Sequence, residues 1–161
     1  MANTQEDTAS EVYSLSIFGT QTPLPTVLAL AAAVTLATGI GEEVLFRGLI
    51  QEGLSGVLGG VGGLIAASLV FGLSHKVETA VHSARWNKHR PPPLTDRTNH
   101  THTQQMGPAD VSFIIVAGAW MGGCYLVLHD LTVPIMLHAT YDFMILISAY
   151  ARAKIRIGPQ E

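Results

Sequence analysis

Long apolar stretches alternate with short polar segments along this chain. The stretches Val57–Leu73 and Val111–Leu128 contain no charged residue, and Val27–Ile50 and Leu131–Ala151 contain only a few ionisable ones. Each stretch is close to the ~20 residues that an α-helix needs to cross a bilayer. The pattern therefore predicts an all-α, polytopic membrane protein, built as a bundle of about four transmembrane helices.

Proline, glycine and polar segments predict where these helices begin and end. Proline is tolerated in a first helical turn. The predicted helices run from Pro23 or Pro25 to about Gln51 with a break at Gly39–Gly41, from about Gly56 to about Trp86, from Ala109 to Leu128, and from the His129–Asp130 turn to near Arg152. The predicted organisation is a polar, mobile tail over 1–22, a membrane core over 23–152 with a polar loop over 87–108 between the second and third helices, and a C-terminal tail over 153–161.

The overall composition agrees with a membrane protein. Of the 161 residues, 48% are hydrophobic and 13% are charged, whereas a soluble domain usually carries about a quarter charged residues. A soluble, fully buried helical core is the alternative, but so short a chain could hardly cover that core with polar surface. The net charge of −3 predicts no nucleic-acid partner. The single cysteine, Cys124, excludes a disulfide framework and a cysteine-rich zinc site.

Basic residues are concentrated on one predicted side of the membrane. Four spans place both termini and the long loop on the same side, and the two short turns carry no Lys or Arg. The positive-inside rule predicts that this side is cytoplasmic. Residues 1–22 lack the positive region of a cleavable signal peptide, so we expect the helices themselves to direct insertion. The basic residues are Lys76, Arg85, Lys88, Arg90 and Arg97 in the loop region, and Arg152, Lys154 and Arg156 in the tail.

Ionisable residues inside the first predicted helix need an explanation, because each costs at least ~2.5–3.5 kcal/mol to insert at the bilayer centre. In "EEVLFR", Glu43 and Arg47 are i,i+4 neighbours and can form an ion pair along one helix face. Glu42 lies about 100° around the helix and is left without this partner. A carboxylate in a poorly hydrated site suits a general base working near neutral pH. A purely structural ion network is the alternative.

Two other helices carry imidazole or carboxylate groups. In "LHATYD", His138 and Asp142 are i,i+4 neighbours, which is the spacing of metal ligands and of base–orienter pairs. A hydrogen bond that only neutralises the two groups is the alternative. His75 lies near the end of the second apolar run, where it is either an interfacial residue or a ligand, and Glu78 and His82 can share its face.

The motifs "EEVLFR", "FGLSH" and "HATYD", in this order, resemble those of the CPBP intramembrane proteases. This family includes the type II CAAX prenyl endopeptidases and the bacterial Abi proteins associated with bacteriocin immunity. The resemblance covers about Ala37–Tyr150. It implies an intramembrane endopeptidase that acts on prenylated or other membrane-associated peptides in the lipid bilayer.

The resemblance also implies roles for individual residues. Glu42 would be the general base that activates water, assisted by His75. His138 and Asp142 would stabilise the oxyanion or, together with Glu42 and His75, hold one divalent metal, with Zn²⁺ as the first candidate. Glu43 would be the second acid of the catalytic motif, and its pairing with Arg47 would be structural.

The sequence departs from the family in two ways. The family usually has Asn where this chain has Asp142, and an ionised Asp142 cannot donate a hydrogen bond to an oxyanion. The carboxylate therefore favours the metal-dependent version. Family members also commonly carry more helices before the "EEVLFR" helix than this chain does.

Three alternatives remain open at this point. "GLSG" at Gly53–Gly56 matches a rhomboid serine-protease signature, with Ser55 as nucleophile and His138 as base, but this leaves the other ionisable residues unexplained. The second alternative is a non-catalytic immunity or scaffold protein that has the same fold. A loop-borne metal site lacks regular ligand spacing; its candidate ligands are His82, His89, His100 and His102.

Overall fold

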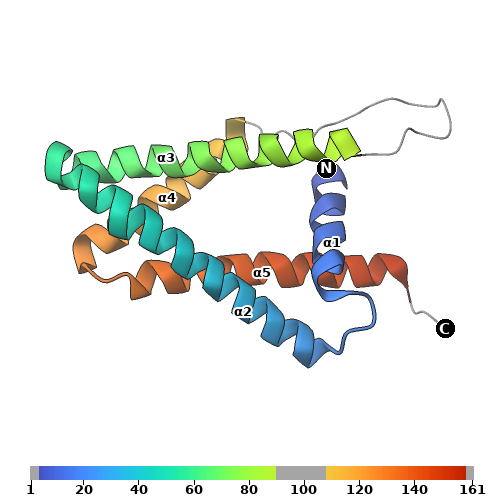
Figure 1. Ribbon diagram of the computed structural model, residues 1–161. Coiled ribbons are helices and arrows are strands. Elements are labelled where there is room, and N and C mark those ends of the chain that lie inside the picture. Colours follow the sequence, from blue (N-terminus) through green and yellow to red (C-terminus); the bar gives the residue numbers. More distant parts are fainter. Residues whose placement is uncertain (1–3, 90–107, 159–161) are drawn as a thin grey trace. The chain divides into compact units, whose positions relative to one another are not determined.

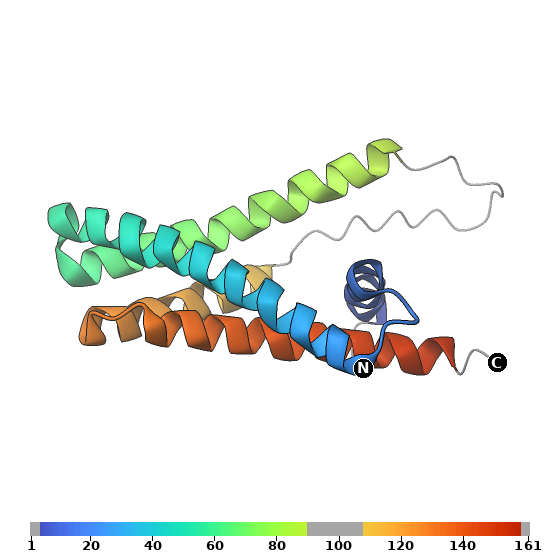
Figure 2. The same cartoon turned by 60° about the horizontal axis from the view of Figure 1, so that its bottom comes forward.

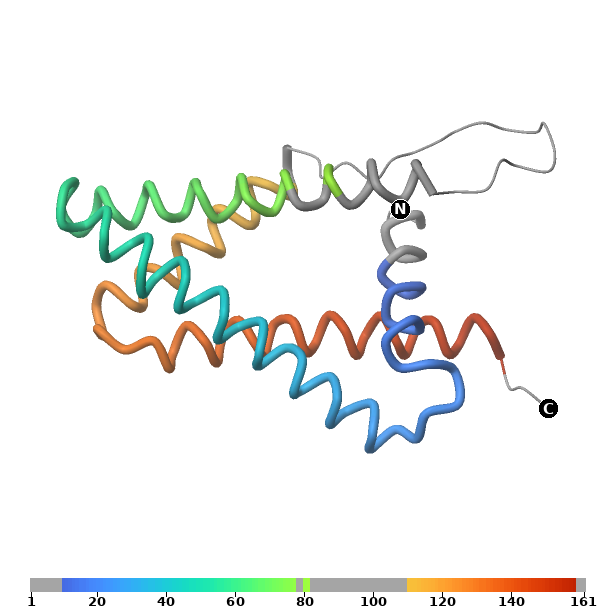
Figure 3. The backbone as a smooth tube through the Cα atoms, viewed as in Figure 1, coloured from blue at the N-terminus to red at the C-terminus, as the bar shows by residue number. Residues whose placement is uncertain are grey.

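The computed structural model describes the backbone of residues 4–89 and 108–158, and the side chains of 10–77, 80–81 and 110–158 (Figure 1). All regular elements in these ranges are helical, so the predicted all-α class is confirmed. They are α1 (Thr4–Phe18), α2 (Leu24–Glu43), the π-helix η1 (Val44–Gln51), α3 (Glu52–His89), α4 (Pro108–Leu128) and α5 (Thr132–Ile157). Figure 3 traces this order along the backbone.

Three helical stretches of the described chain are long and apolar enough to cross a membrane: Leu24–Val77, Asp110–Leu128 and Thr132–Ile157. The first has 54 residues, which corresponds to about 80 Å of helix and is more than twice the ~30 Å hydrocarbon thickness. Gly59 interrupts it with φ 75° and ψ 163°, and the chain turns sharply in the first part of α3 (Figure 1). The described chain thus contains three candidate spanning stretches, and the predicted number of four crossings stays a prediction.

Several predicted boundaries are corrected. Thr4–Phe18 forms α1, where the sequence pattern indicated a mobile tail, and α5 continues to Ile157. The expected break at Gly39–Gly41 is absent, because α2 continues through these glycines and changes to π-helix only at Val44. The following helix begins at Glu52 rather than near Gly56. The predicted loop over 87–108 lies mostly outside the described residues.

The chain divides into two compact units. The first contains Met1–Gly48 and Leu128–Glu161, and the second contains Leu49–Val127. In the first unit, α2 packs on α5 through residues that recur every fourth position: Val27, Ala31, Thr35, Gly39 and Glu43 are all buried. A Cβ atom on Gly39 would lie 3.3 Å from Ala139 N. The absence of a side chain at Gly39 thus allows the two backbones to approach closely, as in other membrane helix pairs.

The second unit also depends on close helix packing. A side chain on Gly72 would collide with Ile115, and one on Gly60 would lie 3.0 Å from Leu126 Cδ1. The buried Gln51 side chain joins the end of η1 to α4, because its Nε2 donates a 3.0 Å hydrogen bond to the Gly122 carbonyl. Small residues therefore set the spacing between the helices of this unit as well.

Candidate active site

The two acids of α2 and the arginine of η1 are placed by their helical spacing. Arg47 Nη1 donates a 2.9 Å hydrogen bond to Glu43 Oε1, and both side chains are buried, with exposed fractions of 2% and 0%. Glu43 is therefore held by Arg47 along one face of the helix, as the i,i+4 spacing predicted. This ion pair is enclosed by protein, where charged groups need a close partner.

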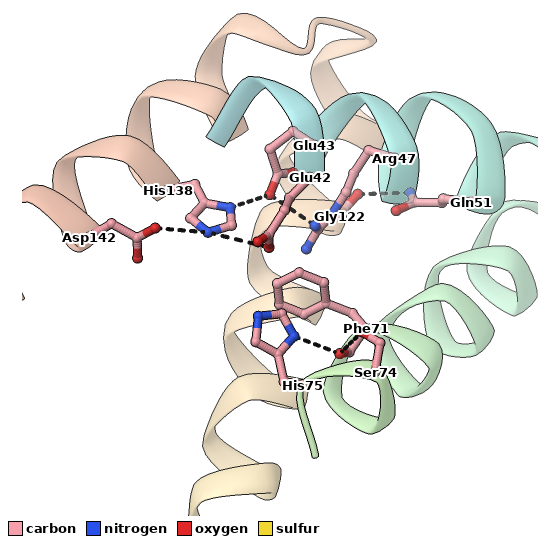
Figure 4. A network of polar contacts seen from close by, with 10 residues as sticks. All are labelled: Glu42, Glu43, Arg47, Gln51, Phe71, Ser74, His75, Gly122, His138 and Asp142. Atoms are coloured by element: carbon pink, nitrogen blue, oxygen red, sulfur yellow. Dashed lines mark hydrogen bonds and ion pairs between the residues drawn. The ribbon is translucent and has the colours of Figure 1, made fainter. Parts of the chain in front are cut away.

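His138 of α5 is the second partner of Glu43 (Figure 4). The ring atom Nδ1 lies 2.8 Å from the same oxygen, Oε1, and His138 is 7% exposed. The proton on Nδ1 is the natural donor, because a carboxylate oxygen only accepts. Glu43 therefore fixes the orientation of the imidazole ring, and its tautomer when the ring is neutral. Sequence spacing did not predict this contact, since the two residues lie far apart in the chain.

The opposite ring nitrogen faces two further carboxylates. His138 Nε2 lies 3.7 Å from Glu42 Oε2 and 3.5 Å from Asp142 Oδ2. The side chains of Glu42 and Asp142 are 29% and 31% exposed, so they are more accessible than Glu43. The expectation that Glu42 has no partner is corrected by this contact with His138. The first unit thus brings Glu42, Glu43, His138 and Asp142 together around one imidazole ring.

His75 belongs to α3 in the second unit. Its Nδ1 lies 2.9 Å from the Phe71 carbonyl oxygen, and its ring centroid lies 4.6 Å from that of Phe71. The ring is therefore oriented by its own helix, with the carbonyl accepting from Nδ1–H. Its predicted cooperation with Glu42 stays a prediction, because the two residues lie in different units.

No group of three or more His, Cys, Asp or Glu side chains within the described ranges is arranged to hold a metal ion. The predicted metal site therefore stays a prediction, and its fourth candidate ligand, His75, belongs to the other unit. The side chains of Glu78, His82, His89, His100 and His102 lie outside the described side chains.

The surroundings of Ser55 favour a structural role. A side chain on Gly63 would lie 2.6 Å from the Ser55 backbone nitrogen. Ser55 is thus packed against Gly63 in the first part of α3, where the chain turns sharply. His138, its partner in the rhomboid alternative, belongs to the other unit.

Sequence reasoning missed one buried polar residue of the second unit. Gln51 is 1% exposed, and among the described residues its Oε1 has no hydrogen-bond partner, although Nε2 bonds to Gly122. The sequence does show a polar amide, Gln51, at the end of an apolar run. Its hydrogen-bond partner is a backbone carbonyl, however, and no pattern of side chains reveals such a partner.

The comparisons with known proteins bear on this arrangement. No curated protein and no solved structure gives a significant match to the chain. The sequence does match the family described as "Type II CAAX prenyl endopeptidase Rce1-like" over residues 24–144, which is more than half of the chain. The matched region contains the two acids of α2, Arg47, His75, His138 and Asp142. This confirms the resemblance seen in the three motifs, and the chain belongs to the Rce1-like family of proteases.

Proposed function

We propose that this protein is an intramembrane endopeptidase that hydrolyses a peptide bond with a water molecule activated by Glu42. The observation that supports this most directly is the environment of His138. One ring nitrogen is anchored 2.8 Å from Glu43, and the other faces Glu42 and Asp142. An oriented imidazole beside a more accessible carboxylate is a combination that acid–base catalysis requires.

In the proposed reaction, Glu42 accepts a proton from water while the water oxygen attacks the carbonyl carbon of the substrate. His138, in its imidazolium form, donates a hydrogen bond from Nε2 to the developing oxyanion. The C–N bond then breaks, and the proton held by Glu42 passes to the leaving amine. The products are a carboxylic acid and an amine, so water supplies all the atoms added. Donors directed at the oxyanion commonly provide a large part of the rate enhancement.

Glu43 and Arg47 act through His138 in this proposal. An imidazolium donates from both nitrogens, so Glu43 stabilises the charged ring and keeps Nε2 directed towards the reacting atoms. Arg47 in turn positions Glu43 through the 2.9 Å hydrogen bond. His75 would assist Glu42, and this assignment rests on the family motif alone. A divalent metal, if bound, would be held by the residues that the family motif assigns to it and would polarise the carbonyl of the substrate.

Membership of a CAAX prenyl endopeptidase family makes prenylated peptides the first substrate class to test. An isoprenoid chain would keep such a peptide at the membrane, where α5 carries His138 and Asp142. We further propose that the basic ends of the helices face the cytoplasm, since Lys154 and Arg156 lie in the last turn of α5.

The test uses the purified protein and a prenylated peptide whose cleavage is followed by mass spectrometry. We expect the wild-type protein to cleave the peptide, and Glu42→Gln to abolish cleavage while the helical circular dichroism signal is retained. Glu52→Gln is the matched control, because this acid lies in α3 with its Oε2 bonded to Tyr125. Retained cleavage by Glu42→Gln would exclude Glu42 as the base.

Two additional arms separate the competing mechanisms. A chelator that stops cleavage, with recovery on addition of Zn²⁺, would show that a metal takes part. Loss of cleavage in Ser55→Ala together with an active Glu42→Gln variant would instead indicate serine-protease chemistry. A wild-type protein that cleaves neither prenylated nor unprenylated peptides would favour a scaffold role.

A further inference from the structure

Helix α1 is fastened to the C-terminal part of α5 by charged and aromatic contacts. Glu11 is 4% exposed, and its two oxygens lie 3.7 Å from Arg152 Nε and 3.2 Å from Arg156 Nη1. The Phe18 and Tyr150 rings meet edge to face with centroids 5.5 Å apart. Just beyond α1, Lys154 Nζ donates a 2.7 Å hydrogen bond to the carbonyl of residue 20. These contacts hold α1 at a defined level of α5.

That level corresponds to the edge of a bilayer. The α5 residues in these ring and charge contacts extend from Tyr150 to Arg156, which places them about 27–36 Å along the helix from Thr132 at 1.5 Å per residue. The hydrocarbon core is ~30 Å thick. If α5 crosses the membrane from Thr132 onward, α1 therefore lies at the depth of the lipid headgroups.

The direction of α1 fits the same location. Figures 1 and 2 both show α1 running across α5 rather than along it. Because a spanning helix follows the membrane normal to within its tilt, a helix that crosses it lies nearly in the membrane plane. The face of α1 away from α5 exposes Val12 and Tyr13, with exposed fractions of 59% and 61%.

The chemistry of the exposed groups matches a phospholipid surface. Tyr is enriched at membrane–water interfaces because its ring is apolar and its hydroxyl is polar. Arg152 and Arg156 remain 44% and 50% exposed while they contact Glu11. They therefore place positive charge at the level where lipid phosphates lie.

We propose that α1 is a membrane-surface helix, which rests in the interfacial layer of the bilayer through Val12 and Tyr13 and is tethered to α5 by Glu11. The partner is the phospholipid surface. This inference concerns a region separate from the catalytic residues and does not depend on the proposed hydrolysis.

Spin labels in phosphatidylcholine vesicles test the proposal with the full chain. In a Cys124→Ser background, single cysteines replace Tyr13, Ile155 or Met144, all exposed positions. Ile155 is the depth-matched control on α5, about 34 Å from Thr132, and Met144 is the deep control, at about 18 Å. Accessibility to oxygen and to a water-soluble nickel complex gives the depth of each label.

We expect the label at position 13 to contact lipid at a depth close to that of position 155 and shallower than that of position 144. A label at position 13 with the full aqueous accessibility of a flexible chain, while positions 155 and 144 report lipid, would overturn the proposal. Glu11→Gln tests the tether: we expect a more mobile label at position 13 with no change at position 144. Unchanged mobility at position 13 would overturn the role of Glu11.

Discussion

The buried pair of Glu43 and Arg47 gives the sharpest prediction about stability. Glu43→Gln keeps the shape of the side chain but removes the carboxylate charge 2.9 Å from Arg47 Nη1. Removing one partner of a buried ion pair costs about 3–5 kcal/mol, because the remaining charge is left buried without compensation. We therefore expect Glu43→Gln to lower the free energy of unfolding by about 3–5 kcal/mol, and more than the double variant Glu43→Gln/Arg47→Met.

The measurement is reversible unfolding in mixed micelles, followed by circular dichroism for the wild type, the two single variants and the double variant. These four proteins form a double-mutant cycle, which isolates the coupling between the two side chains. If Glu43→Gln unfolds within about 1 kcal/mol of the wild type, the pair does not carry the stability argued from its burial. Strict additivity of the two single effects would also contradict the coupling.

Glu43→Gln also separates the proposed positioning role of Glu43 from the proposed catalytic role of Glu42. Loss of a carboxylate that orients a metal-binding histidine typically costs 10–100-fold in activity or metal affinity, and we expect an effect of about this size on cleavage from Glu43→Gln, because Glu43 orients His138 in the same way. Glu42→Gln should instead abolish cleavage with little loss of stability, because the Glu42 side chain is 29% exposed. Equal stability losses in both variants would refute the distinction between the two acids.

Two further predictions concern packing and pH. Gly39→Leu should destabilise the fold by about 1–3 kcal/mol through overpacking, since even a Cβ atom there would lie 3.3 Å from Ala139 N. Gly41→Leu should have little effect, because a Cβ atom there would meet nothing within 4 Å. Similar unfolding curves for both variants would contradict the close approach of α2 to α5. The backbone N–H of Thr132 donates to Asp130 and holds the pKa of that carboxyl below its ordinary value of 3.8. This contact should therefore stabilise the protein above pH 3.8 and cease to do so as the pH falls through the lowered pKa. Asp130→Asn should remove this part of the acid dependence of unfolding, and an unchanged dependence would show that the contact is absent in solution.

Local patterns predicted the helices and the ion pair. The apolar runs indicated the spanning stretches because burial in lipid demands continuous hydrophobicity. The Glu43–Arg47 pair was predictable because helical geometry alone brings positions i and i+4 together.

The contacts between helices were not predictable in the same way. Glu43 and His138 are 95 positions apart, and no spacing rule states which face of α5 meets α2. The sequence pattern indicates a tail in place of α1 because these 15 residues contain no long continuous apolar run, and so short a helix is only marginally stable alone. Its contacts with Tyr150 and Arg156 stabilise it. These are tertiary contacts, which local sequence patterns do not reveal.

The π-helix η1 bears on the length of the chain as well as on its composition. Its hydrogen bonds run from residue i to i+5, so each turn holds more residues than an α-helical turn. A π-helical segment accommodates an additional residue, so deleting one residue from Val44–Gln51 would restore α-helical turns, whereas a deletion in a regular α-helical turn rotates the residues that follow it in that helix by about 100°. Leu45 and Leu49 are exposed and can be exchanged for other apolar residues. The segment should therefore accept apolar substitutions at these exposed positions, and it should tolerate the loss of one of them better than the α-helical turns beside it.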